Sequence, residues 1–123
     1  MRTIYPVFRY ADPRAAIAFL VEAFGFDVRE VSEGPDGTVR HAELTFDTGM
    51  IMVGQAAEPG RGRPTADAWR VYVAVDDVDG HHNRAKAAGA EIVQPLTDQP
   101  YGSREYGARD SEGNAWSFGT YRP

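Results

Sequence analysis

The stretch Asp110-Ser111-Glu112-Gly113-Asn114 predicts a tight turn directly before an apolar strand that runs to Tyr121. A second turn with a glycine, Asp47-Thr48-Gly49, precedes another apolar strand 64 residues earlier (113 − 49 = 64). The chain therefore carries the same local pattern twice. A period of this size is typical of two copies of one supersecondary unit, and two such units facing each other make a cleft.

Two predicted helices repeat at the same offset. Asp12, which precedes a proline, is a typical N-cap, and Asp76 is the predicted cap of the second helix (76 − 12 = 64), with Asp79 at the capping-box position. Gly25 and Gly89 are the predicted helix ends, because glycine takes the left-handed conformation that closes many helices. The first helix is apolar nearly all round, so it needs a cover besides its own sheet, and a second subunit is one candidate.

The other elements follow the same order in both copies, since alternating apolar residues between turn signals predict strands. Strands are expected at 4–11, 26–33, 38–46 and 50–55 in the first copy, and at 69–75, 90–95, 103–109 and 114–121 in the second. This order predicts one α+β domain of two tandem βαβββ modules. The predicted domain spans 1–123, with module 1 at about 1–55, a linker at 56–68 and module 2 at about 69–123.

Composition excludes several functions. The chain has 123 residues and no cysteine, so disulfides, a thiolate nucleophile and thiolate metal sites are excluded. Its net charge of −5 argues against binding to nucleic acid or anionic membranes, whose phosphates need a basic surface. The sequence has no apolar run long enough to span a membrane and no signal-peptide core, so the expected location is the cytoplasm.

Two βαβββ modules with the turn 110–114 before the last strand resemble the vicinal oxygen chelate superfamily. That group includes glyoxalase I, bleomycin-resistance proteins, fosfomycin-resistance enzymes and extradiol dioxygenases. Its final hairpin usually reads Asp-Pro-Asp-Gly-Asn or Asp-Pro-Asp-Gly-His, and here Ser111 and Glu112 replace the middle pair. The resemblance covers the whole chain and implies a curved mixed sheet around a cleft, with helices on the convex side. The stretch from Tyr101 to Tyr106 resembles the metal-lacking, bleomycin-resistance-like branch.

The resemblance also implies four positions for metal ligands, one each in the first, fourth, fifth and eighth strands. Counting from the helix caps and the last turn, these positions fall on Tyr5, Val53 (or Met52 if the register slips), Arg70 and Ser117. None of them is the histidine, glutamine or glutamate of the metal-dependent members, and a fixed guanidinium repels a cation. We therefore expect no metal and no cofactor.

Strand alternation predicts which side chains face the cleft. The predicted ligand-binding residues are Tyr5, Arg9, His41, Arg70, Tyr72, Glu105 and Arg109. His41, Glu43 and Glu105 are the acid–base candidates, and also the residues from which an unusual metal site would be built. Arg70 either holds an anionic group or pairs with Glu43 or Glu105.

Several other side chains receive structural predictions. Trp116 and Phe118 alternate with the cleft position Ser117, so they are expected in the core. His81 and His82 are helix neighbours, poorly placed to chelate together, and are expected at the surface or partly packed. Two aromatic residues near strand ends and loops are open between gating the cavity and an ordinary surface role: Trp69 and Tyr101.

Three functions stay open. The first is a metal-independent protein, similar to the bleomycin-resistance proteins, that binds and sequesters a drug or metabolite in the cleft. The second is an isomerase or lyase that uses acid–base residues in the same cleft. The third is an interaction subunit with a vestigial pocket. The resemblance also implies a homodimer, which the apolar first helix supports, and in which one chain or two chains form the cleft.

Overall fold

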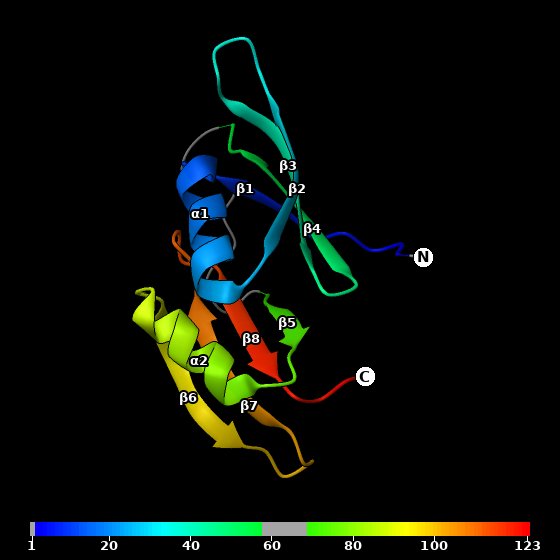
Figure 1. Ribbon diagram of the computed structural model, residues 1–123, viewed down its shortest axis with the longest axis vertical. Helices are drawn as coiled ribbons and strands as arrows, with labels where there is room; N and C mark the ends of the chain where they lie inside the picture. The colour runs from blue at the N-terminus through cyan, green and yellow to red at the C-terminus, as the bar shows by residue number, and fades with distance from the viewer. Residues whose placement is uncertain (1, 58–68) are drawn as a thin grey trace.

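The computed structural model describes residues 2–57 and 69–123. Module 1 consists of β1 (Val7–Tyr10), α1 (Pro13–Phe24), β2 (Asp27–Glu33), β3 (Val39–Phe46) and β4 (Gly49–Gln55). Module 2 consists of β5 (Val71–Ala74), α2 (Val78–Ala87), β6 (Glu91–Asp98), β7 (Arg104–Arg109) and β8 (Ala115–Gly119). The modules lie end to end in an elongated molecule, with α1 and α2 on the same side (Figure 1). Most of the predicted linker, 58–68, lies outside the described residues.

Each module forms its own four-stranded sheet, and the two sheets have the same topology. The strand orders are β1-β4-β3-β2 and β5-β8-β7-β6. In each sheet the first pair, β1 with β4 and β5 with β8, is parallel, and the other pairs are antiparallel. The α+β class and the tandem βαβββ order predicted from the sequence are therefore confirmed. Neither helix in the described part of the chain is long and apolar enough to cross a membrane.

The first helix begins and ends as predicted, but the second begins one residue later. Asp12 Oδ1 accepts the Ala15 N–H, and Gly25 ends α1 with a φ of 83°. The cap of α2 is Asp77, whose Oδ1 accepts the Gly80 N–H at 3.0 Å, so the prediction of Asp76 was wrong. The reason is that the chain stays bonded to β8 for one residue after β5, through the next N–H and the carbonyl of the last β8 residue.

The cap at Asp77 shows that the repeat is not one constant offset. The caps differ by 65 (77 − 12), and so do the buried positions Val53 and Phe118 of β4 and β8 (118 − 53). The buried positions Ala42 and Tyr106 of β3 and β7 differ by 64 (106 − 42). With these equivalences, the turn between β7 and β8 holds one residue more than the turn between β3 and β4.

An aromatic core joins the modules into one body. Trp116 of β8 stacks on Phe8 of β1, with ring centroids 5.0 Å apart and planes 8° apart. Phe24 of α1 contacts Phe118 of β8 at 4.8 Å. Trp116 and Phe118 are 1% and 0% exposed, so their predicted core role is confirmed. The C-terminal end of the apolar α1 contacts α2 of the same chain, whose Arg84 donates to backbone carbonyls there.

Candidate functional site

The open face of module 1, the side of its sheet away from α1, carries a small charged network. Strand β3 alternates as predicted, with Leu44 buried and with His41 and Glu43 half-buried on the opposite side. His41 Nε2 lies 3.0 Å from Glu43 Oε2, and Arg29 Nη1 lies 2.7 Å from Glu43 Oε1. The hydrogen bond from His41, with the Arg29 guanidinium nearby, holds the pKa of the Glu43 carboxyl below its ordinary value.

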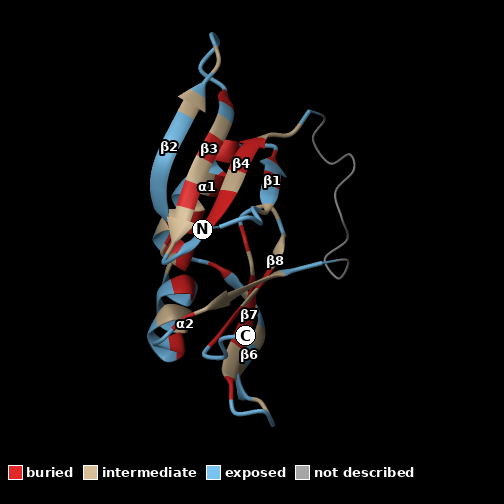
Figure 2. Cartoon of the chain, turned by 90° about the vertical axis from the view of Figure 1, so that its right-hand side faces the viewer, coloured by how far each residue is buried: buried red, intermediate tan, exposed pale blue. Residues whose placement is uncertain are grey.

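Two other predicted ligand-binding residues belong to module 1. Arg9 crosses the backbone of Gly54, where an added Cβ would lie only 2.8 Å from the Arg9 Nη1. Tyr5 is 37% exposed, and its hydroxyl donates to the Arg2 carbonyl at 3.2 Å. Figure 2 shows the strands of this sheet, with β2 exposed along most of its length and β4 largely buried.

The open face of module 2, the side of its sheet away from α2, holds the rest of the predicted set. Arg70 Nη1 donates to Ser117 Oγ at 3.3 Å, so its partner is this hydroxyl and not Glu43 or Glu105. Arg109 donates to a carbonyl in the turn 110–114 at 3.1 Å and lies 3.5 Å from a carboxylate of β6. The predicted ligand-binding residues of module 1 and those of module 2 therefore contact groups of their own module.

The four positions that the fold family uses for metal ligands do not carry a donor set for a metal. Val53 is 1% exposed and packs in the core, so the open-face residue of β4 is Met52. The positions then hold a phenol, a thioether, a guanidinium and a hydroxyl: Tyr5, Met52, Arg70 and Ser117. Divalent cations in such sites need imidazole or carboxylate donors that converge on one point. Within residues 2–57 and 69–123, no three histidine or carboxylate side chains are arranged to hold a metal ion, and this includes the candidates His41, Glu43 and Glu105.

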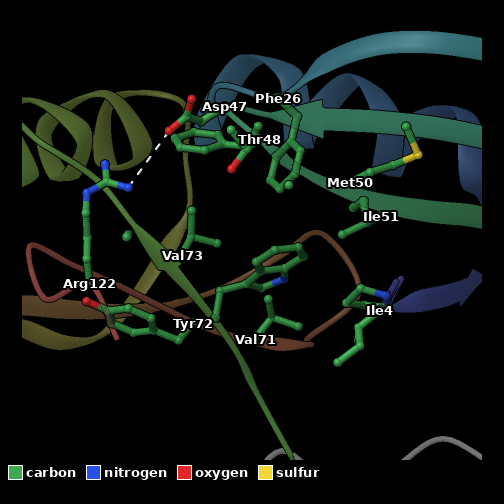
Figure 3. A pocket seen from close by; sticks show the side chains of 15 residues that line it. Ile4, Phe26, Asp47, Thr48, Met50, Ile51, Val71, Tyr72, Val73 and Arg122 are labelled. Carbon is green, nitrogen blue, oxygen red and sulfur yellow. Dashed lines mark ion pairs between the residues drawn. The ribbon is translucent and has the colours of Figure 1, made fainter. Parts of the chain in front are cut away.

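A pocket of about 350 Å³ opens where the two modules meet. It lies between the end of the β3–β4 hairpin and the edge strand β5 (Figure 3). Its walls are mainly apolar and aromatic, while the polar side chains lie toward one end, where Arg122 Nη1 is 3.9 Å from Asp47 Oδ2. The lining residues are Ile4, Pro6, Phe26, Phe46, Asp47, Thr48, Gly49, Met50, Ile51, Val71, Tyr72, Val73, Ala74, Trp116 and Arg122.

Tyr72 is the one predicted ligand-binding residue that lines this pocket. The other lining residues were missed because strand alternation does not describe this pocket: all four residues of the edge strand β5 line it, together with residues of a turn and of a chain end. Asp47 has a φ of 52°, a left-handed conformation that aspartate tolerates better than most residues. The only signal in the sequence for this part of the pocket was the two-residue turn at Asp47. Arg122 lies beyond the last strand and pairs with Asp76 at 3.0 Å as well as with Asp47.

The turn 110–114 fixes the two modules against each other. Asp110 is 7% exposed, and its Oδ2 accepts the Tyr10 hydroxyl at 2.6 Å and the Trp116 Nε1–H at 3.1 Å. Burial, together with the nearby Asp110 carboxylate, raises the pKa of Tyr10 far above its ordinary value. The Glu112 carboxylate accepts the N–H groups of Ala11 and the next residue at 2.7 and 2.8 Å. Glu112, one of the two departures from the usual hairpin, therefore binds the N-terminus of α1.

A histidine makes a further polar contact between the modules. His81 of α2 is partly packed, as predicted, with Nδ1 2.6 Å from the Tyr106 hydroxyl and Nε2 2.8 Å from the Phe24 carbonyl. An Nε2–H donating to the carbonyl leaves Nδ1 as the acceptor from Tyr106. Burial lowers the pKa of His81 and raises that of Tyr106. These two groups are therefore held neutral, which suits a structural contact.

Comparison with known proteins agrees with the topology. The model of the Glyoxalase/Bleomycin resistance protein/Dioxygenase superfamily matches residues 4–118. The crystal structure of TioX from Micromonospora sp. ML1 is 38% identical, with a TM-score of 0.80 over 99% of this chain and 98% of that one. The uncharacterised protein Mb0911c of Mycobacterium bovis is 34% identical over 121 residues, which cover 88% of this chain and 76% of that protein. The fosfomycin resistance protein FosX from Mesorhizobium loti is 15% identical, with a TM-score of 0.71 over 98% of this chain and 92% of its own, and shares the fold. The chain therefore belongs to the Glyoxalase/Bleomycin resistance protein/Dioxygenase superfamily.

Proposed function

We propose that this protein binds a planar, largely apolar small molecule in the pocket between its modules, without a metal, and so sequesters a drug or metabolite. The observation that carries this proposal is the pocket of about 350 Å³, which is within the usual size range of ligand sites. Phe46 and Tyr72 are partly exposed aromatic residues of the lining that can contact a planar ligand, and Asp47 and Arg122 supply charge at one end. Apolar walls with a few polar groups are typical of small-molecule sites.

A role in antibiotic resistance is part of the proposal. It is supported by the superfamily, which includes bleomycin resistance proteins, and by the fold shared with the fosfomycin resistance protein FosX. Expression in a susceptible bacterium, with growth measured against planar antibiotics, tests it. No change in resistance to any of them would leave metabolite binding as the proposed role.

Filling the pocket tests the binding site. Val71 lines the pocket, so Val71→Phe places a ring in the space that the ligand occupies. Val93 of β6 is 47% exposed and is not among the lining residues, so Val93→Phe is the matched control. We expect 2-naphthol and coumarin, as planar neutral probes, to bind the native protein and the control in calorimetry, and to bind Val71→Phe at least ~10-fold more weakly. Equal binding by all three proteins would contradict the site.

We propose a homodimer in which the open faces of module 1 and module 2 from different chains lie against each other. The apolar α1 is weaker support than expected, because α2 of the same chain contacts its C-terminal end. Support comes from the open faces, where polar side chains such as His41 and Tyr72 are only half-buried in one chain. Light scattering coupled to gel filtration tests the dimer, and a monomer at micromolar concentration would contradict it.

A metal-independent isomerase or lyase is the second candidate, favoured by one observation. The imidazole of His41 and the carboxylate of Glu43 lie 3.0 Å apart, a pairing that can move a proton at a bound substrate. Loss of turnover in His41→Ala with ligand binding retained would support it, whereas a bound ligand recovered unchanged would favour sequestration. The third reading, an interaction subunit with a vestigial pocket, gains no support because an open pocket of about 350 Å³ is present.

A further inference from the structure

We propose that module 2 also carries a binding site for an organic cation, formed by three tyrosines around one carboxylate. This tyrosine cluster consists of Tyr72, Tyr101, Tyr121 and Glu105. This proposal names the charge of the ligand, which the proposal for the pocket does not. The tyrosine cluster adjoins the pocket through Tyr72, which belongs to both. As a statement about the pocket's ligand it rests on the proposed function, but the cluster itself can be tested separately.

The rings and the carboxylate lie close enough to surround one small cation. The rings of Tyr101 and Tyr121 are 6.0 Å apart and meet at 78°, so they form two walls of a corner. The Tyr101 hydroxyl lies 2.9 and 3.0 Å from the two carboxylate oxygens of Glu105. Glu105 and Tyr72 both lie over Gly119, because an added Cβ there would be 2.5 Å from the Glu105 Cγ and 2.8 Å from the Tyr72 hydroxyl. The missing side chain at Gly119 gives these two residues their place.

Backbone contacts hold the cluster in position. Tyr101 lies in a turn closed by the Gly102 N–H donating to the Gln99 carbonyl at 3.0 Å. Ser103, which is 3% exposed, accepts the Tyr121 N–H on its hydroxyl at 3.1 Å. The Tyr72 hydroxyl donates to the Tyr121 carbonyl at 2.6 Å. Prearranged aromatic rings lose less freedom when a ligand binds, which favours affinity.

The charges around the cluster also favour a cation. Within the described residues, Glu105 forms no ion pair, so its carboxylate is not neutralised by a basic side chain. Arg104 and Arg122, the sequence neighbours of Glu105 and Tyr121, each already lie beside two carboxylates. The bond to Glu105 is also the main reason why the pKa of Tyr101 is raised, which keeps that ring neutral.

Exposure of the rings points to recognition and not to packing. Tyr101 is 62% exposed and Tyr121 is 48% exposed, although both carry large apolar rings. The face of an aromatic ring attracts cations, and rings arranged as a box are the usual means of binding quaternary ammonium groups. A carboxylate beside such rings adds direct charge attraction. The expected ligand class is therefore an alkylammonium or quaternary ammonium compound, with any planar apolar part lying in the adjoining pocket.

Choline and its uncharged isostere 3,3-dimethyl-1-butanol test the cluster, since they have the same shape and differ in charge. In NMR titrations of the native protein we expect choline to bind at least ~10-fold more tightly than the isostere. Tyr101→Leu and Glu105→Gln should each weaken choline binding ~5-fold or more, and Gly119→Ala should do so by displacing the carboxylate. His82→Leu, which removes a partly exposed ring of α2 outside the cluster, is the control and should leave choline binding unchanged.

Two results would overturn the proposal: equal binding of choline and its isostere, or native choline affinity in Tyr101→Leu. Tyr101 is in an exposed turn, so its variant keeps the fold, and the amide spectrum verifies this. The Val71→Phe variant separates this proposal from the pocket, because it should lose 2-naphthol and keep choline. Loss of choline binding in Tyr101→Leu together with an unaltered response to 2-naphthol supports the cluster whatever the fate of the pocket.

Discussion

The two turns at the ends of the central hairpins occupy the same place in each module but do different things. The first, at Asp47, is exposed and forms the charged rim of the pocket. In the second, the side chain of Asp110 is buried and accepts hydrogen bonds from both modules. One extra residue in the second turn accompanies this difference. The comparison teaches that duplicated positions diverge first where the chain is free of sheet pairing, so one copy can serve binding and the other stability.

The same substitution in both turns separates these roles. Asp110→Asn replaces an acceptor of four or more hydrogen bonds with a group that also donates, next to the Tyr10 hydroxyl and the Trp116 N–H. We expect it to lower the free energy of unfolding by about 3 kcal/mol, because a buried network loses acceptors it needs. Urea unfolding followed by Trp fluorescence measures this. A loss below about 1 kcal/mol would mean that the hydrogen bonds of Asp110 do not hold the two modules together.

Removing one donor from the same network should have a smaller effect. Tyr10→Phe deletes the hydroxyl that donates to Asp110 and keeps the ring in the core. The expected loss is about 1.5 kcal/mol in urea unfolding, typical of a buried hydrogen bond to a charged group. Tyr5→Phe removes an exposed hydroxyl and is the control, with no measurable change expected. Equal losses of unfolding free energy in both variants would show that the Tyr10 hydroxyl does not stabilise the contact between the modules.

The contact between modules at His81 predicts a pH dependence. Its folded pKa lies below the ordinary value of 6.5, chiefly because of burial, so the unfolded chain binds the proton more readily. Its contribution to stability is therefore present above about pH 6.5 and is lost as the pH falls toward the lowered pKa. The denaturation midpoints at pH 7.5 and 5.5 should differ less from each other in His81→Asn than in the matched variant His82→Asn, which keeps His81. Identical pH profiles for the two variants would contradict this account.

The smallest effect on stability is expected at the exposed turn. Asp47→Asn keeps a residue that tolerates the left-handed conformation and removes only the charge facing Arg122. The free energy of unfolding should change by less than about 0.5 kcal/mol, as for most exposed ion pairs. Affinity for a charged planar ligand should change in calorimetry, since this charge lines the pocket. A large loss of stability with unchanged ligand affinity would reverse the roles assigned to the two turns.

Most of the fold was predictable because periodic burial fixes it. The alternation at β3 and the core role of Trp116 followed from side chains that repeat every two residues along a strand. The cap at Asp77 did not follow, and Met52 was left as the alternative to Val53 for the open-face residue of β4. One constant offset between the modules does not account for a turn with one extra residue. A shift of one residue then moves a side chain to the other face of a sheet.

The candidate site was less predictable than the fold. Sequence alternation placed Arg70 and His41 on open faces, but not which groups would pair with them. The pocket depends on where the turn at Asp47 and the chain end at Arg122 meet, and such packing between distant segments leaves no periodic signal. The tyrosine cluster likewise brings together β5, a loop and the chain end. Sites made by loops and termini are therefore where the structure adds most.

The contact of Arg84 with the end of α1 makes the two modules non-interchangeable. α1 has no basic residue in its last turn, and Arg84 of α2 donates to the carbonyls of Val21 and Glu22 there. The position on α1 that corresponds to Arg84, at the offset of 64 between the left-handed glycines Gly25 and Gly89 that follow the helices, is the buried Leu20. α1 therefore returns no such contact to α2. Two copies of module 1 could not form this contact with each other, so each module now has its own fixed role in the interface.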